Sequence, residues 1–150
     1  MNFNEKIDLF KKRFSSNDFS VPQRNRKKIL REVESNFITL PKDYYELNNT
    51  NNRFSNWWDN TNGSINEIKS SEIKTQLIEI LNVNEVHWIA CEFSNHILIY
   101  KASVHSIFEL INYTKNNSNQ FHIVQLKYEY MISLIVQDNK TIIKKCNKRN

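Results

Sequence analysis

In the segment VHWIACEFSNHILIYK, residues 86–101, the spacing of apolar residues changes from helical to extended. Two runs rich in β-branched and aromatic residues, 86–93 and 97–101, flank the short polar turn Ser94-Asn95-His96. Such runs around such a turn predict a β-hairpin with a three-residue loop. We therefore expect an antiparallel sheet to begin at this point of the chain.

The residues after the hairpin predict one more helix and three more strands. Ser103 suits the N-cap of a helix, because its hydroxyl can accept a hydrogen bond from the first turn. The apolar positions of that helix would be Val104, Ile107, Phe108 and Ile111. Further strands are expected at 121–127, 131–137 and 141–145, joined by tight turns. The expected order after residue 86 is therefore ββαβββ.

The residues before the hairpin predict helices. Phe3, Ile7, Phe10 and Phe14 lie along one stripe of a first helix. A second helix is expected after Ser20-Val21-Pro22-Gln23, which resembles a capping box. The apolar face of this second helix would consist of Ile29, Val33 and Phe37.

A polar connection at 48–64, which contains the only glycine, Gly63, is expected to lead into a third helix. This helix would span about 71–81, with Ser71 as its N-cap. Its apolar side would consist of Ile73, Leu77, Ile78, Ile80 and Leu81. Helices followed by the ββαβββ order predict an α+β fold, in which helices pack on a mostly antiparallel sheet. The length of 150 residues and the lack of a linker-like stretch predict a single domain, residues 1–150.

Composition excludes several classes of protein. Hydrophobic residues make up 39% and charged residues 25%, which is typical neither of a disordered chain nor of a membrane protein. A single glycine excludes the glycine-rich turns that bind dinucleotides or phosphates. The first 14 residues lack the apolar core of a signal peptide, and two cysteines are too few for a disulfide framework. We therefore expect a cytoplasmic protein.

Charge is distributed unevenly along the chain. Residues 1–31 carry nine Lys or Arg against three acids, residues 32–100 carry four against ten, and residues 101–150 carry eight against three. The net charge of +5 therefore combines an acidic middle with two basic ends. A single basic surface would require the two ends to meet in space.

No pattern of residues predicts catalysis, a metal site or a cofactor. The histidines fit no metal-binding motif and are expected to be ordinary surface or half-buried residues, namely His87, His96, His105 and His122. Cys91 lies among alternating apolar residues, which is typical of an inert buried thiol with a raised pKa. His87 would lie about 13 Å from it along the same strand, too far for a hydrogen bond. We therefore expect no enzyme, although a triad assembled from distant residues is the alternative.

Two stretches are candidates for binding. Trp57-Trp58-Asp59 lies in a polar loop, so the indoles either fill the core or anchor a partner. We hypothesise that this cluster forms a partner-binding face together with Asp43 and Glu46. The second stretch is one face of the second helix, which could contact nucleic-acid phosphates or simply be solvated, and comprises Arg24, Lys27, Lys28 and Arg31.

The segment FHIVQLKYEYM, residues 121–131, resembles the aromatic-x-Ile-Val-x-x-Lys-Tyr hairpin of small bacterial domains. Some of these domains are similar to immunity proteins that are encoded beside polymorphic or contact-dependent toxins. The strand at 86–93 and the strand ending at 98–101 fit the same pattern, so the resemblance covers about residues 86–143. Related sequences often carry a Trp and a Glu-Asn-His-His-like segment after the turn. This chain has Tyr130 and the residues Ser133-Leu134-Ile135-Val136 at those positions, so the resemblance assigns no functional residues to it.

The resemblance implies a protein that neutralises a cognate toxin by stoichiometric binding, without catalysis. Inhibitors of nuclease toxins tend to be acidic, whereas this chain carries +5. Either the acidic block at 32–100 makes the contact, or the toxin is acidic or is not a nuclease. The alternative prediction is a basic nucleic-acid-binding accessory protein of a phage or defence locus. Neither prediction involves a membrane.

Overall fold

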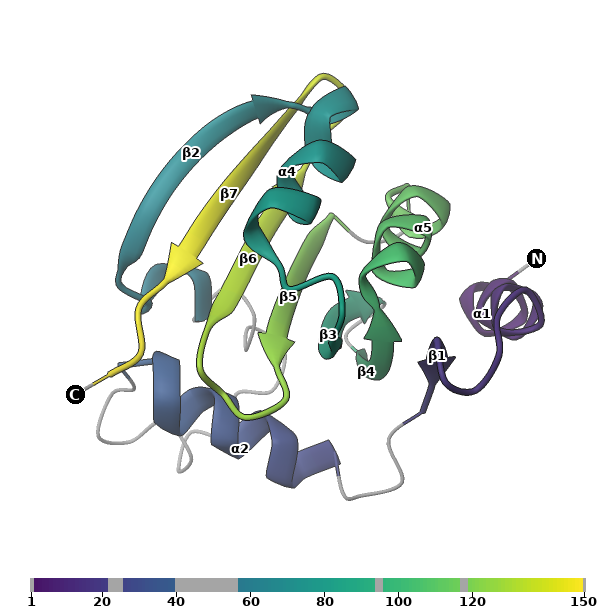
Figure 1. The fold of residues 1–150 in the computed structure, drawn as a ribbon, viewed down its shortest axis with the longest axis horizontal. Coiled ribbons are helices and arrows are strands. Elements are labelled where there is room, and N and C mark those ends of the chain that lie inside the picture. The colour runs from purple at the N-terminus through teal and green to yellow at the C-terminus, as the bar shows by residue number, and fades with distance from the viewer. Residues whose placement is uncertain (1, 22–25, 40–56, 94–95, 117–118, 150) are drawn as a thin grey trace.

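The computed structural model describes residues 2–21, 26–39, 57–93, 96–116 and 119–149 (Figure 1). Its helices are α1 (Phe3–Lys11), α2 (Arg26–Phe37), α4 (Ile73–Ile80) and α5 (Val104–Thr114), with a 3-10 turn at Ser70–Glu72 and helical residues at 57–59. Its strands are β1 (Phe19–Ser20), β2 (Gly63–Lys69), β3 (Val86–Phe93), β4 (His96–Ser103), β5 (Gln120–Gln125), β6 (Met131–Val136) and β7 (Lys140–Cys146).

All seven strands form one sheet in the order β1-β4-β3-β5-β6-β7-β2, and every neighbouring pair is antiparallel. The strands of the C-terminal half lie in the middle, and two strands from the N-terminal half form the edges. The predicted α+β class is confirmed, as is the ββαβββ order after residue 86.

Side chains of the sheet alternate between two apolar layers. On β3, Ile89 and Cys91 point into the layer beneath α1, α4 and α5, whereas Ala90 points into the layer beneath α2. Figure 1 shows α4 and α5 over one face of the sheet, and α2 packs on the other. The strands of the sheet centre are therefore apolar on both faces, as buried strands require.

An aromatic cluster holds the first helix and the first strand against the sheet. The ring of Phe10 from α1 meets the ring of Phe19 from β1 edge-on, with 5.0 Å between centroids. Phe19 in turn stacks on Tyr100 of β4 at 4.8 Å. The α1 helix starts in a capping box, in which Asn2 and Glu5 satisfy each other's backbone N–H groups.

Two predicted helix caps differ from the structure, and one is confirmed. Ser20 is a strand residue paired with Lys101, and Val21 after it is not helical, so the predicted cap at Ser20 is wrong. Pro22 and Gln23 lie outside the described residues. Ser71 lies in the 3-10 turn, and α4 begins after Glu72 without a side-chain cap. Ser103 does cap α5, accepting a hydrogen bond from the backbone N–H of Ser106.

Strand β2 was not predicted, because the expected polar connection extended through Gly63 and Ser64. Five of its seven residues are exposed, so it lacks the apolar alternation by which strands are recognised. Ser70 follows β2 and donates a 2.6 Å hydrogen bond to the carbonyl oxygen of Gln137. This bond joins the 3-10 turn to the residues just before β7.

Candidate functional site

Trp57 belongs to the core. It is fully buried in the layer beneath α2, and its indole N–H donates a 2.9 Å hydrogen bond to Oε2 of Glu34. The ring of His122 meets it edge-on at 5.1 Å between centroids. A buried indole needs a hydrogen-bond acceptor, and the carboxylate from α2 provides one. The hypothesis that Trp57 contacts a partner is therefore corrected in favour of the core alternative.

A strip of buried polar side chains continues from Trp57 across the sheet. Nδ1 of His122 lies 2.7 Å from Oγ of Ser133, which in turn lies 3.5 Å from Sγ of Cys146. Burial lowers the pKa of His122 to about 3, so its imidazole is neutral at physiological pH. The prediction of surface or half-buried histidines is wrong for His122 and for His87, since both are fully buried.

Trp58 and Asp59 emerge from this buried strip onto the surface. Trp58 is half-buried and Asp59 is exposed. The ammonium group of Lys144 on β7 donates a 2.7 Å hydrogen bond to the carbonyl oxygen of Trp58 and lies 5.4 Å from the centroid of its ring. Thr61 donates a second hydrogen bond, of 3.2 Å, to the same carbonyl oxygen. Lys144 and Thr61 therefore fix the backbone of Trp58, and the ammonium group of Lys144 also contacts its indole ring.

A shallow cleft opens beside Trp58. It has a volume of about 290 Å³ and is lined by Trp58, Asp59, Asn119, Gln120 and Ile135. The apolar side chains of Trp58 and Ile135 lie among the carboxylate of Asp59 and the amides of Asn119 and Gln120. This is the composition of an apolar anchor within a polar rim, as in protein interfaces. The other two residues of the hypothesised partner face, Asp43 and Glu46, lie outside the described residues.

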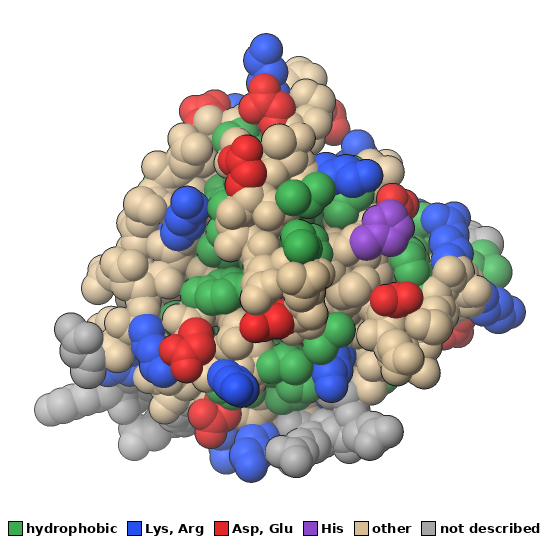
Figure 2. Space-filling model, viewed as in Figure 1, with side chains coloured by type: hydrophobic (Ala, Val, Ile, Leu, Met, Phe, Trp, Pro, Cys, Tyr) green, Lys and Arg blue, Asp and Glu red, His purple; other side chains and the backbone are tan. Residues whose placement is uncertain are grey.

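The basic side chains predicted on the second helix are exposed where they are described. Lys27, Lys28 and Arg31 lie on the side of α2 that faces away from the sheet, and Arg24 lies outside the described residues. Figure 2 shows basic and acidic side chains interspersed along the lower edge of the molecule.

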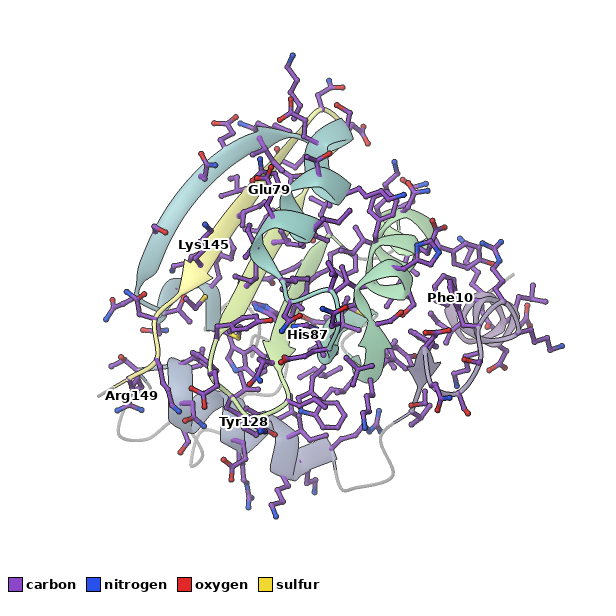
Figure 3. The ribbon with its side chains drawn as sticks, viewed as in Figure 1. Phe10, Glu79, His87, Tyr128, Lys145 and Arg149 are labelled. Atoms are coloured by element: carbon purple, nitrogen blue, oxygen red, sulfur yellow. The ribbon has the colours of Figure 1, made fainter. Side chains whose placement is uncertain are left out.

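The basic C-terminal segment contacts the end of α2, whose residues here belong to the acidic block 32–100. The backbone N–H of Arg149 donates a 2.6 Å hydrogen bond to the carbonyl oxygen of Asn36, the penultimate residue of α2. The guanidinium group of Arg149 donates a 2.9 Å hydrogen bond to the carbonyl oxygen of Ile38. Figure 3 shows Arg149 beside this end of the helix.

A second group of polar side chains lies on the opposite face of the sheet. Nε2 of His87 is hydrogen-bonded to the hydroxyl of Tyr130, which also accepts a 3.4 Å hydrogen bond from the backbone N–H of Asn82. Burial lowers the pKa of His87, and the nearby carboxylate of Glu85 opposes this shift. Cys91 on the same strand is fully buried, and burial raises its pKa to about 12, as expected. Within the described part of the chain, no group of three His, Cys, Asp or Glu side chains could hold a metal ion.

An apolar hollow between α4 and α5 was missed by sequence reasoning. Its volume is about 230 Å³, and it is lined by Lys74, Leu77, Ile78, Val83, Val104, His105 and Phe108. Ile78 was expected on the buried side of the third helix, yet it is 49% exposed, and Val83 is 52% exposed. Figure 2 shows hydrophobic side chains at the surface on this side of the molecule, next to a histidine.

Comparison with known proteins adds no family to these observations. Neither family models, nor curated proteins, nor solved structures match this chain. No helix within the described ranges is long and apolar enough to cross a lipid bilayer.

Proposed function

We propose that this protein binds a protein partner stoichiometrically through the Trp58–Asp59 cleft, defined as Trp58, Asp59, Asn119, Gln120 and Ile135. The resemblance of residues 86–143 to immunity proteins further suggests that the partner is a bacterial toxin. The observation that carries the proposal is the fixed position of Trp58 over Lys144 at the side of an open cleft.

A rigid aromatic side chain is a favourable anchor for an interface. Tryptophan buries a large area on binding, and the loss of side-chain freedom is small when the indole is already held in place. Two hydrogen bonds to the Trp58 carbonyl oxygen fix the backbone, and the ammonium group beneath the ring fixes the indole. The cleft is therefore organised before a partner arrives.

The polar residues of the cleft supply direction and specificity. Asp59 is exposed and would meet a basic group of the partner, while Asn119 and Gln120 can both donate and accept hydrogen bonds. Such a rim steers the encounter more than it raises the affinity. We therefore expect the partner to present a basic side chain next to an apolar pocket for the indole.

The test is affinity capture from a lysate of the native host after nuclease digestion. The wild-type chain should retain one protein in one-to-one amount, and Trp58→Ala should reduce the retained amount at least tenfold. Asp59→Lys should also weaken retention, whereas Asp8→Lys, an equal charge reversal on exposed α1, should not. Equal retention by wild type and Trp58→Ala would refute the assigned cleft.

The toxin assignment is tested on the captured protein itself. Expressed alone in a host, it should arrest growth, and co-expression of the wild-type chain should restore growth. Co-expression of Trp58→Ala should restore it much less. A captured protein that leaves growth unaffected would refute the immunity function while leaving the binding function intact.

A second candidate function is nucleic-acid binding, favoured by the contact between Arg149 and the end of α2. This contact brings the basic segment at 144–149 next to the helix that carries Lys28 and Arg31. Cations on neighbouring segments can contact successive phosphates of one strand, which requires only charge and reach.

The second candidate predicts a steep dependence on salt. Binding of labelled double-stranded DNA, followed by fluorescence anisotropy, should weaken linearly in log affinity as log salt rises. Lys28→Glu combined with Arg31→Glu should abolish it, whereas Lys74→Glu, on the opposite face of the sheet, should change it little. Binding that is absent in the wild type, or equally weakened by Lys74→Glu, would exclude this function.

A further inference from the structure

Among the strands that the structure describes, β2 forms one edge of the sheet, and none of them pairs with its outer side. It pairs with β7 over its full length, from Gly63 opposite Cys146 to Lys69 opposite Lys140. No other strand within the described residues pairs with it, and Figure 1 shows it as the outermost strand. Just before the strand, Thr61 forms an isolated bridge with Ile38, so the open edge begins at about Gly63.

The backbone hydrogen bonds at the ends of β2 reveal which of its residues point outward. The carbonyl oxygen of Asn62 accepts from the backbone N–H of Asn147, and the backbone N–H of Ser70 donates to the carbonyl oxygen of Asn139. Both residues therefore direct their backbone groups toward β7. Because this direction alternates along an antiparallel strand, the odd-numbered residues direct their N–H and C=O groups outward. These outward residues are Gly63, Ile65, Glu67 and Lys69.

Of the usual protections against pairing, this edge carries only charge, at Glu67 and Lys69. Natural sheets protect their edges with short strands, prolines, bulges or charges. The opposite edge, β1, is only two residues long, whereas β2 has seven residues, no proline and regular pairing throughout. At its middle, Ile65 is 62% exposed, the most exposed large hydrophobic side chain among the described residues.

We propose that the outer side of β2 pairs antiparallel with β2 of a second copy of this chain, about a two-fold axis at Asn66. The two strands can form hydrogen bonds only in registers that place residues with outward backbone groups opposite each other. A two-fold axis at Asn66 gives such a register. In this register Gly63 of each copy pairs with Lys69 of the other, and Ile65 of each copy pairs with Glu67 of the other. It is also the register in which all seven residues of the strand overlap, so every outward N–H and C=O group finds a partner.

The charges of β2 disfavour the register with its axis at Glu67, while overlap of the full strand favours Asn66 over Ile65. An axis at Glu67 would place two carboxylates directly opposite each other, which is destabilising. With the axis at Asn66, no charged side chain stands opposite a like charge. Glu67 also lies 3.7 Å from the ammonium group of Lys140 on β7, which offsets its charge within its own chain. The strand is therefore complementary to itself, as an interface with two-fold symmetry requires.

The first experiment measures the mass of the protein in solution over a range of concentrations. Sedimentation equilibrium should show a species of twice 18.0 kDa that grows with protein concentration. Ile65→Pro removes one outward N–H and no bond to β7, so it should leave the protein folded and shift it to the monomer. Ile65→Thr is the matched control, because it keeps the N–H and should keep most of the dimer. Circular dichroism of each variant verifies the fold.

The second experiment tests the register. The proposed axis makes Asn66 its own partner in a non-hydrogen-bonded pair, with Cα atoms about 4.5 Å apart, within the range of a disulfide. Asn66→Cys should therefore form a covalent dimer under mild oxidation. Ser64→Cys is the control, since the two copies of residue 64 would lie about 13 Å apart. The native cysteines, Cys91 and Cys146, are buried.

Each result decides for or against the proposal. A concentration-dependent dimer that is lost in Ile65→Pro and cross-linked by Asn66→Cys alone supports it. A monomer at all concentrations overturns it. A dimer that persists in folded Ile65→Pro, or that Ser64→Cys cross-links equally well, also overturns it, because the contact would then lie elsewhere or in another register.

Discussion

The indole N–H of Trp57 and the carboxylate of Glu34 form a fully buried hydrogen bond of 2.9 Å between two segments 23 residues apart. This bond attaches the helical residues 57–59 to α2, and it positions the neighbouring Trp58 and Asp59 at the surface. The stability of the fold and the geometry of the proposed cleft therefore depend on the same pair.

Removing the acceptor for Trp57 should destabilise the whole protein. Glu34→Ala leaves a buried N–H without its carboxylate, so we expect the free energy of unfolding to fall by about 2–3 kcal/mol. Urea denaturation followed by circular dichroism measures this change. Ser35→Ala, at the exposed neighbouring position of α2, is the control and should change stability by less than about 0.5 kcal/mol. A loss equally small in Glu34→Ala would contradict the structural role of the bond.

Gly63 should tolerate no side chain. A Cβ atom at this position would lie 2.0 Å from the carbonyl oxygen of Lys145, and backbone atoms cannot move aside cheaply. We expect Gly63→Ala to lower the free energy of unfolding by about 2 kcal/mol or more, as overpacking does. Ser64→Ala, one residue further along the same edge strand, should be nearly neutral. Thermal unfolding of the two variants separates them, and equal midpoints would show that the strands approach less closely than described.

Burial of His122 should make the protein less stable in acid. Its pKa is lowered to about 3 in the folded state, from 6.5 when unfolded, so the unfolded chain binds more protons between these values. Stability should therefore be complete above pH 6.5 and fall by roughly 1 kcal/mol per pH unit below it, from this group alone. His87 adds a contribution of the same sign, because burial lowers its pKa too.

The control for the acid prediction is His122→Gln, which cannot titrate. Its unfolding free energy should decline less steeply between pH 6.5 and pH 4 than that of the wild type, whatever its stability at neutral pH. Parallel pH profiles of the two proteins would mean that His122 is not buried in its neutral form.

Lys144 should determine the mobility of Trp58. Lys144→Met keeps the aliphatic stem but removes the hydrogen bond to the Trp58 carbonyl oxygen and the cation under its ring. We expect tryptophan fluorescence to become easier to quench with acrylamide and partner affinity to fall several-fold. Lys145→Met, at the exposed adjacent position of β7, should change neither property. If both variants quench equally, Lys144 does not hold the indole.

Local patterns predicted much of the second half of the fold. The hairpin and the cap at Ser103 depend on residues within a few positions of one another, and both are present. The predicted three-residue loop is wrong, because His96 belongs to β4 and pairs with Phe93. β2 was missed because an edge strand is exposed on both faces, so its side chains do not alternate in polarity. Ile78 was assigned to the buried side of its helix because the spacing of apolar residues cannot reveal a hollow between two helices.

The α+β class, the order of the C-terminal elements and the burial of Cys91 could be predicted from residue spacing, because each depends on positions along a single element. The different positions of two adjacent tryptophans in the same polar stretch depend on tertiary contacts. Trp57 is buried because Glu34 offers its N–H an acceptor, and Trp58 is held at the surface by Lys144, 86 residues away. Contacts over such distances depend on how the helices and the sheet pack, which no local pattern of residues records.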